Sequence, residues 1–269
     1  MLATTWAQVK IGPLLRREAD LRTYHNLFRH RPDEITGLRR LWLRASVTER
    51  EEPTNLENRP DVSGSETVIV RFDGWRDCFQ PLNGWDEWLA QELRAITRRR
   101  WLQEADSVPI VPVAINVRCG DFAVPKNPKE LCTRAGVRTP LSWFIDSLHA
   151  IRQAAGADLA AYVVSDGTDQ ELGPLLACNN VFRVRPGSAI SGLLFLARAR
   201  VLIGAGGSSF SAWASFLGQM PTISHLGKSL AGFKLRNRRG FYLGEFDPAN
   251  PNPAFLDEAA WLLTSSACS

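Results

Sequence analysis

The sequence has no long apolar run and few of the residues that mark extracellular or zinc-binding proteins. No stretch approaches the roughly 18 uninterrupted apolar residues of a membrane span, and residues 1–20 lack an apolar signal core. The 5 cysteines are scattered and odd in number, with no close pair at metal-ligand spacing. These absences argue against a disulfide framework and a structural zinc site, and a reducing cytoplasm fits best. We expect a soluble protein, or one bound to a membrane surface.

A strong excess of one charge is also lacking. The net charge of +4 over 269 residues is too small to indicate a nucleic-acid partner. Arginines gather in the first part of the chain, where they fit either solvated helix faces or attraction to an acidic substrate or to anionic lipid headgroups. These arginines are Arg16, Arg17, Arg22, Arg29, Arg31, Arg39, Arg40 and Arg44. Peripheral membrane association therefore stays open as an alternative.

From residue 108 onward, short apolar runs alternate with amphipathic stretches. This alternation is typical of an α/β fold with a doubly wound parallel sheet and helices on both faces. The expected strands cover 108–117, 160–165, 181–184, 201–203 and 221–224. The expected helices cover 140–155, 169–176, 191–199 and 209–217.

The first hundred residues carry fewer strand signals. A polar, turn-rich stretch at 46–67 predicts a long surface loop, and residues 67–72 predict a strand. Residues 85–101 have helical spacing of their large apolar side chains, and we expect their tryptophans in the core. The composition places a domain boundary near residues 105–108.

Two of the expected strands end in residues that suit an anion. The first is followed by a cation and a carboxylate, and the second by glycines and hydroxyls. The residues concerned are Asn116, Arg118, Gly120 and Asp121 in the first segment, and Gly206, Gly207, Ser208, Ser209 and Phe210 in the second. Residues just past the carboxyl ends of parallel strands line the ligand crevice of an open α/β sheet. An arginine opposite a glycine-serine turn can hold a diphosphate, so a nucleotide-linked substrate is the leading hypothesis.

Three segments then resemble one family. Asn-Val-Arg-Cys-Gly-Asp-Phe (116–122) is similar to the His-x-Arg-Arg-Gly-Asp-Tyr motif of the α-1,2/α-1,6/protein O-fucosyltransferase superfamily. Val-Val-Ser-Asp (163–166) resembles its second motif, in which a strand is followed by Ser-Asp-Asp. The segment Gly-Ser-Ser-Phe-Ser-Ala-Trp-Ala-Ser-Phe-Leu (207–217) resembles the third, Asn-Ser-Ser-Phe-Ser-Trp-Trp-Ala-Ala-Tyr-Leu. The resemblance covers about residues 108–225, in the right order and spacing.

The resemblance implies a GT-B arrangement, in which two Rossmann-like halves face a cleft. The first half, 1–107, would then be the acceptor side, and the second, 108–269, would bind the nucleotide-sugar donor. Residues 6–24 and 79–88 also resemble bacterial members related to the α-1,2 branch, which are family 11-like. The reaction that the resemblance implies is inverting, needs no metal and uses GDP-fucose.

The residues make physical sense in those roles. The departing diphosphate gains negative charge, which the forked guanidinium of Arg118 can stabilise. Backbone N–H groups of residues 206–208, opening the helix from Ser209, can form a second anion site. Asp121 can orient Arg118, cap a turn or act as general base, and orientation is favoured. His25 and Glu34, in the acceptor half, are further candidates for the base.

Base recognition is assigned by the same reasoning. Asp166 can accept the N1 and N2 protons of guanine, a pairing that would select GDP over UDP, and Asp169 is a second candidate. Asn116, Gly120 and Phe210 complete the expected nucleotide-binding set. We expect no resident metal or cofactor besides the donor, and the sequence does not indicate an oligomeric state.

Five of the departures from the family motifs bear on the expected site. Asn116 replaces the usual His, Cys119 the second Arg, Gly167 the second Asp, Gly207 the Asn and Ala212 the first Trp. Losing a cation beside a diphosphate would cost on the order of 1–3 kcal/mol of charge-assisted bonding. These departures leave open a transferase with another donor sugar, or a non-catalytic nucleotide- or sugar-binding protein. An α/β-hydrolase is disfavoured, because the turn at Gly207 lacks the G-x-S-x-G elbow.

Overall fold

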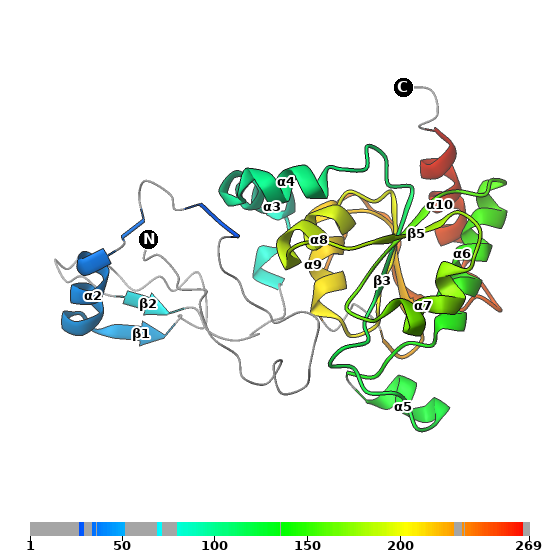
Figure 1. The fold of residues 1–269 in the computed structure, drawn as a ribbon, viewed down its shortest axis with the longest axis horizontal. Coiled ribbons are helices and arrows are strands. Elements are labelled where there is room, and N and C mark those ends of the chain that lie inside the picture. The colour runs from blue at the N-terminus through cyan, green and yellow to red at the C-terminus, as the bar shows by residue number, and fades with distance from the viewer. Residues whose placement is uncertain are drawn as a thin grey trace.

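The computed structural model describes fourteen helices and strands in one main body and a smaller group of three elements before it. The residues described are 27–29, 34–35, 37–51, 69–71, 80–134, 136–228, 233 and 235–265. Helix α2 (Gly37–Ser46) and the short parallel strands β1 (Glu49–Glu51) and β2 (Ile69–Arg71) lie to one side of the body (Figure 1). The second Rossmann-like half expected in 1–107 falls largely on residues outside these ranges.

The main body is built on a six-stranded, all-parallel sheet. Its order is β5-β4-β3-β6-β7-β8. The strands are β3 (Val113–Val117), β4 (Ala161–Ser165), β5 (Val181–Val184), β6 (Val201–Ile203), β7 (Thr222–His225) and β8 (Leu243–Phe246). The chain starts at the centre, winds outward to β5, crosses back beside β3 and winds outward the other way. The predicted α/β fold with a doubly wound parallel sheet is confirmed.

Apolar side chains on both faces of the sheet explain why its strands are continuous apolar runs. All five residues of β3 are buried. Val113, Ile115 and Val117 pack on one face, while Ala114 packs on the other. A strand buried on both sides needs no polar alternation, which is why the predicted strands could be read from short apolar runs.

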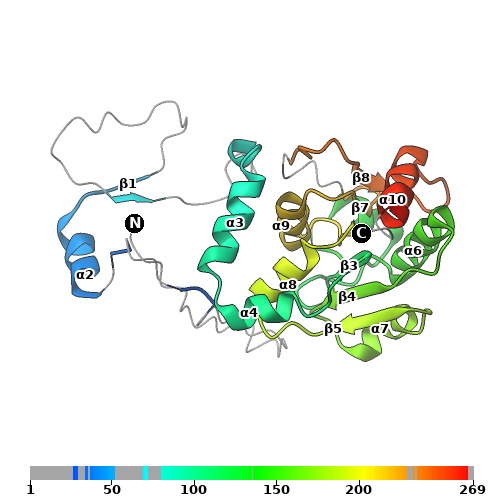
Figure 2. The same cartoon turned by 90° about the horizontal axis from the view of Figure 1, so that it is seen from above.

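Helices cover both faces (Figure 2). The first face carries side chains from helices on either side of β4 and at the end of the chain: α6 (Leu141–Ala155), α7 (Asp169–Leu176) and α10 (Pro253–Ser265). The second face carries α8 (Ala189–Leu196) and α9 (Ser209–Gly218). Outside these lie α3 (Asp86–Ile96), which packs on α9, and α4 (Arg99–Ala105), which packs on α8. The domain boundary near 105–108 stays a prediction.

The helix expected over 85–101 is wrong as one continuous element. It breaks at Thr97, whose backbone is extended (φ −69°, ψ 138°) and forms an antiparallel bridge with Phe28. The backbone around Thr97 therefore pairs with the segment around Phe28 and does not continue the helix. The tryptophan prediction also fails in part, because Trp85 and Trp88 are 58% and 53% exposed.

The remaining elements follow the sequence with small shifts and some omissions. The helix at 169–176 and the strands at 181–184 and 201–203 are confirmed to the residue. The strand expected from 108 begins at Val113, after the two prolines. Four further elements were not predicted: α2, α5 (Pro128–Thr133), β8 and α10. Of the loop expected at 46–67, residues 49–51 form β1, and most of the rest lies outside the described ranges.

The end of α6 provides a test of the local structure. Gly156 ends the helix in the left-handed region (φ 63°, ψ 22°), and a Cβ there would meet nothing within 4 Å. Replacing Gly156 with Ala should therefore cost about 1 kcal/mol of unfolding free energy through backbone strain alone. Gly156→Asn should cost less, because Asn tolerates this conformation. Denaturant midpoints measure both, and an alanine variant as stable as wild type would contradict the predicted helix end.

Candidate diphosphate site

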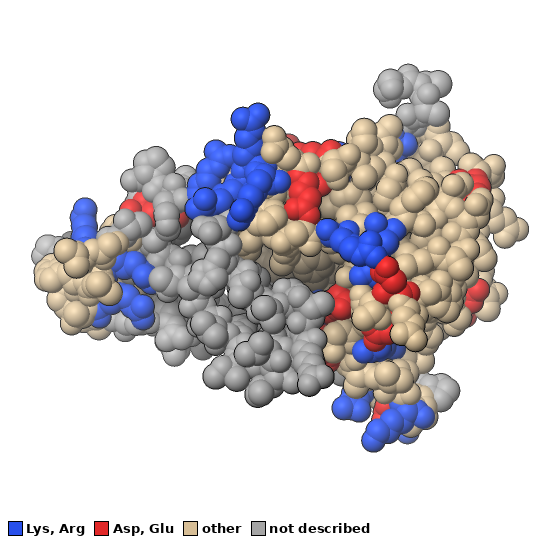
Figure 3. Space-filling model, in the orientation of Figure 1, with Lys and Arg blue, Asp and Glu red and all other residues tan. Residues whose placement is uncertain are grey.

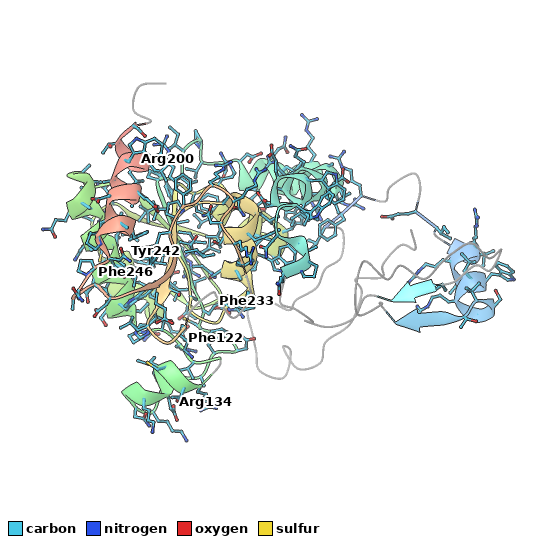
Figure 4. All side chains as sticks on the ribbon, turned by 180° about the vertical axis from the view of Figure 1, so that it is seen from behind. Phe122, Arg134, Arg200, Phe233, Tyr242 and Phe246 are labelled. Carbon is cyan, nitrogen blue, oxygen red and sulfur yellow. The ribbon has the colours of Figure 1, made fainter. Side chains whose placement is uncertain are left out.

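The topology brings the predicted anion-binding residues to one edge of the sheet. Winding reverses between the neighbouring strands β3 and β6, and ligands of open α/β sheets bind outside the carboxyl ends at such a switch point. Arg118 directly follows β3 and the Gly206 turn follows β6. Figure 4 shows Phe122, past the end of β3, near the lower edge of the main body, and Arg200, which precedes β6, near its upper edge. The two strands that flank the switch point thus deliver the cation and the glycine turn that the sequence predicted.

Two carboxylates hold Arg118. Its Nη2 lies 2.5 Å from Asp121 Oδ1, and its Nη1 lies 3.2 Å from Asp166 Oδ2. The guanidinium carbon sits 5.4 Å from the centre of the Phe122 ring. Its Nε is buried and donates no hydrogen bond to any residue that the structure describes. The pairing with Asp121 is compatible with the favoured role of that residue, and the orientation of Arg118 by Asp121 stays a prediction.

Asp166 joins the ends of β3 and β4. Its Oδ1 accepts a hydrogen bond from the backbone N–H of Cys119 at 2.7 Å, while Oδ2 pairs with Arg118. Gly120 is required beside it, because a Cβ at this position would lie 2.9 Å from Asp166 Oδ2. Both oxygens are thus engaged in this structure, and guanine recognition by Asp166 stays a prediction. The alternative, Asp169, pairs with Arg183 at 3.7 Å and also with Arg185.

The turn after β6 presents backbone N–H groups at the start of α9. Gly207 adopts φ +71°, a conformation suited to glycine. In the described part of the chain no group accepts a hydrogen bond from the N–H of Gly206, Gly207 or Ser209. Ser208 caps α9: its buried hydroxyl accepts the N–H of Ser211 at 3.4 Å. The backbone, together with the positive end of the helix dipole, can therefore bind an anion here.

Two of the residues expected to bind the nucleotide, Asn116 and Phe210, pack beside this turn. The Asn116 side chain donates a hydrogen bond to Ser211 Oγ at 2.7 Å, and both residues are buried. Phe210 packs against the apolar cluster on the second face of the sheet. Asn116 therefore ties β3 to the first turn of α9, and we expect it to act on the site by positioning that helix.

Two of the departures from the family motifs contact each other. Cys119 is buried, and a Cβ added to Gly167 would lie 2.7 Å from its Sγ and 2.9 Å from its Cβ. Burial, the largest influence, raises the pKa of the Cys119 thiol, which keeps it protonated and unreactive at neutral pH. Position 119 thus points toward β4 and not toward the Gly206 turn. The expected loss of a cation beside the diphosphate does not follow from this geometry.

The other candidates lie away from this edge or are packed. His225 places its ring against Trp143, with ring centres 5.6 Å apart, and His149 is exposed on α6. Glu34 is partly buried, and His25 lies outside the described residues. In the described ranges no three His, Cys, Asp or Glu side chains gather as metal ligands. No helix among them is both long and apolar enough to span a bilayer.

Two pockets lie elsewhere on the domain. One, of about 400 Å³, lies between β4, β5, α4 and α8, with the rings of Tyr162 and Phe182 on its wall. The other, of about 530 Å³, lies at the end of α6 beside Gly156. Neither is lined by Arg118 or by the Gly206 turn. We place the site at the switch point because a diphosphate requires converging donors and cations more than an apolar hollow.

The solved structures similar to this chain include two crystal structures of POFUT1, a protein O-fucosyltransferase: one in complex with GDP and one in the apo form. Both are 17% identical to this chain, with TM-scores of 0.34 and 0.38. The match covers 63% of this chain and 56% of theirs, so this chain spans little more than half the length of those proteins. A likeness at these TM-scores supports neither a family nor an activity. No family model and no curated protein matches the sequence.

The buried pair under α9 can be tested by a double-mutant cycle. Asn116→Ala should destabilise the protein by roughly 1–3 kcal/mol, because it removes the partner of a buried hydroxyl. Ser211→Ala leaves the amide unpaired and should have a similar effect. The double variant should lose less than the sum of the two, as measured by denaturant unfolding. Strict additivity would contradict the contact.

The contact between Cys119 and Gly167 predicts a steric rescue. Gly167→Ala should destabilise the protein by roughly 1–3 kcal/mol, because its methyl group overlaps the thiol. Adding Cys119→Ala should recover part of that loss, because it removes the Sγ at 2.7 Å but keeps the Cβ at 2.9 Å from the new methyl group. Thermal unfolding of the single and double variants measures this, and an equally unstable double variant would show that the strain lies elsewhere.

Proposed function

We propose that the chain is an inverting, metal-independent glycosyltransferase that transfers L-fucose from GDP-fucose to a hydroxyl of a glycan acceptor. The observation that carries the proposal is that Arg118 and the Gly206 turn follow the two neighbouring strands at the switch point of the parallel sheet. That pairing supports a diphosphate ligand on physical grounds. The fucose donor rests on the motif resemblance at the same residues.

The proposed chemistry follows from charge. The bond between the sugar C1 and the phosphate oxygen breaks, and the GDP that leaves gains negative charge. Arg118 and the N–H groups at the start of α9 would stabilise that charge from two sides. The acceptor oxygen forms its bond to C1 from the opposite face, and its proton passes to a base.

Asp121 is the less favoured candidate for that base, because its Oδ1 is already bonded to Arg118. A base from the acceptor-side half, 1–107, is the alternative, and it goes with the proposed GT-B arrangement. The acceptor glycan and a cytoplasmic location, free or peripheral to a membrane, complete the proposal.

Calorimetric titration with GDP, UDP and GDP-fucose tests the proposal. Wild type should bind GDP and GDP-fucose but not UDP. Arg118→Ala should weaken GDP binding by about 10-fold or more, the scale of a lost charge-assisted contact. Arg94→Ala is the matched control, because Arg94 forms a similar ion pair, 2.6 Å from Asp106, near the amino ends of the strands.

Turnover separates the proposed enzyme from a binding protein. A transferase should release GDP from GDP-fucose, at least slowly to water, whereas a binding protein should bind without release. Failure to bind GDP, or undiminished transfer by Arg118→Ala, would overturn the proposal.

A further inference from the structure

Lys228 lies on the far side of the Gly206 turn from Arg118. It follows β7, which neighbours β6, just as Arg118 follows β3 on the other flank of β6. The strand order therefore places one cation on each side of the turn that opens α9. Nothing in the sequence marked this lysine, because it stands alone after a strand and belongs to none of the motifs.

The side chain of Lys228 runs across the turn itself. A Cβ added to Gly206 would lie 2.1 Å from Lys228 Cβ and 2.6 Å from its Cγ. The lysine is only 7% exposed, and its ammonium donates to the backbone carbonyl of Arg134, at the end of α5. Figure 4 shows Arg134 at the same end of the molecule as Phe122, and Figure 3 shows basic side chains gathering over α5.

The turn that carries Lys228 is held in place on its other side. Gly227 adopts φ +73°, and a Cβ there would lie 2.6 Å from the Cα of Cys132 in α5. The Cys132 thiol in turn donates to the Leu226 carbonyl at 3.6 Å. The lysine is thus wedged between α5 and the glycine turn.

The charge of this ammonium is poorly compensated. Within the described ranges no carboxylate lies within ion-pair distance of it, and two of its three N–H groups have no acceptor. Burial accordingly lowers its pKa. An ammonium held out of water without an opposite charge costs folding free energy. A bound anion would supply the missing opposite charge and so account for an ammonium in this place.

We propose that Lys228 is the second cation of the diphosphate site, so that the two phosphates of the donor lie between it and Arg118. This rests on the proposed function and deepens it. It also answers the departure at position 119: Cys119 faces Gly167, and the second positive charge comes from β7 instead.

The experiment compares wild type, Lys228→Met and Lys129→Met by calorimetric titration with inorganic pyrophosphate and with GDP. Methionine keeps the stem that crosses Gly206 and removes only the charge. Lys129, exposed on α5, receives the same substitution as the control. Lys228→Met should weaken binding of both ligands about 10- to 100-fold. Lys129→Met should stay within about twofold, the scale of a screened surface charge.

Thermal unfolding without ligand separates a binding role from a structural one. Because the ammonium lacks a counter-charge, Lys228→Met should unfold at the same temperature as wild type or higher. A lower unfolding temperature would overturn the inference, since the lysine would then serve the fold. Unchanged binding by Lys228→Met, with weakened binding by Arg118→Ala, would overturn it and leave the proposed function intact. If wild type bound neither pyrophosphate nor GDP, both the role of Lys228 and the proposed function would be overturned.

Discussion

The burial of β3 between β4 and β6 is the constraint on which the rest of the domain depends. A strand with every residue buried must be covered on both faces, and that requires helices from both directions of winding. Because the chain leaves β3 toward β4 and returns at β6, the turn that follows β3 and the turn that follows β6 lead away from each other. The space between those turns is open to a ligand for topological reasons, before any side chain is considered.

Much of the main body could be predicted because its signals are local. The helix at 169–176 has a capping box from Thr168 and Glu171, and the helix from Ser209 is capped by Ser208. The elements that escaped prediction depend on distant partners. The break at Thr97 needs Phe28, far away in sequence, and β8, at the edge of the sheet, pairs with only one of the described strands, β7. The spacing of apolar residues along the chain does not reveal such distant partners.

The same distinction applies to the site. Arg118 and the glycine turn were found because each directly follows an apolar run. The contacts of Asn116 with Ser211 and of Cys119 with Gly167 were not predicted, because these partners come from other strands and helices. Lys228 is the clearest omission: it has no motif, and only its close approach to Gly206 in space sets it apart from other lysines.

Under the proposed function, the two carboxylates on Arg118 would affect the rate of turnover. A phosphate group that reaches Arg118 must compete with Asp121 and Asp166, which pair with its Nη2 and Nη1. Part of the attraction between guanidinium and phosphate is therefore cancelled by contacts that are lost on entry and regained on departure. In the proposed reaction, such a site would hold the GDP product less tightly than an unpaired arginine would, and Asp121 and Asp166 would pair with Arg118 again once the product leaves. An enzyme limited by product release gains from that balance.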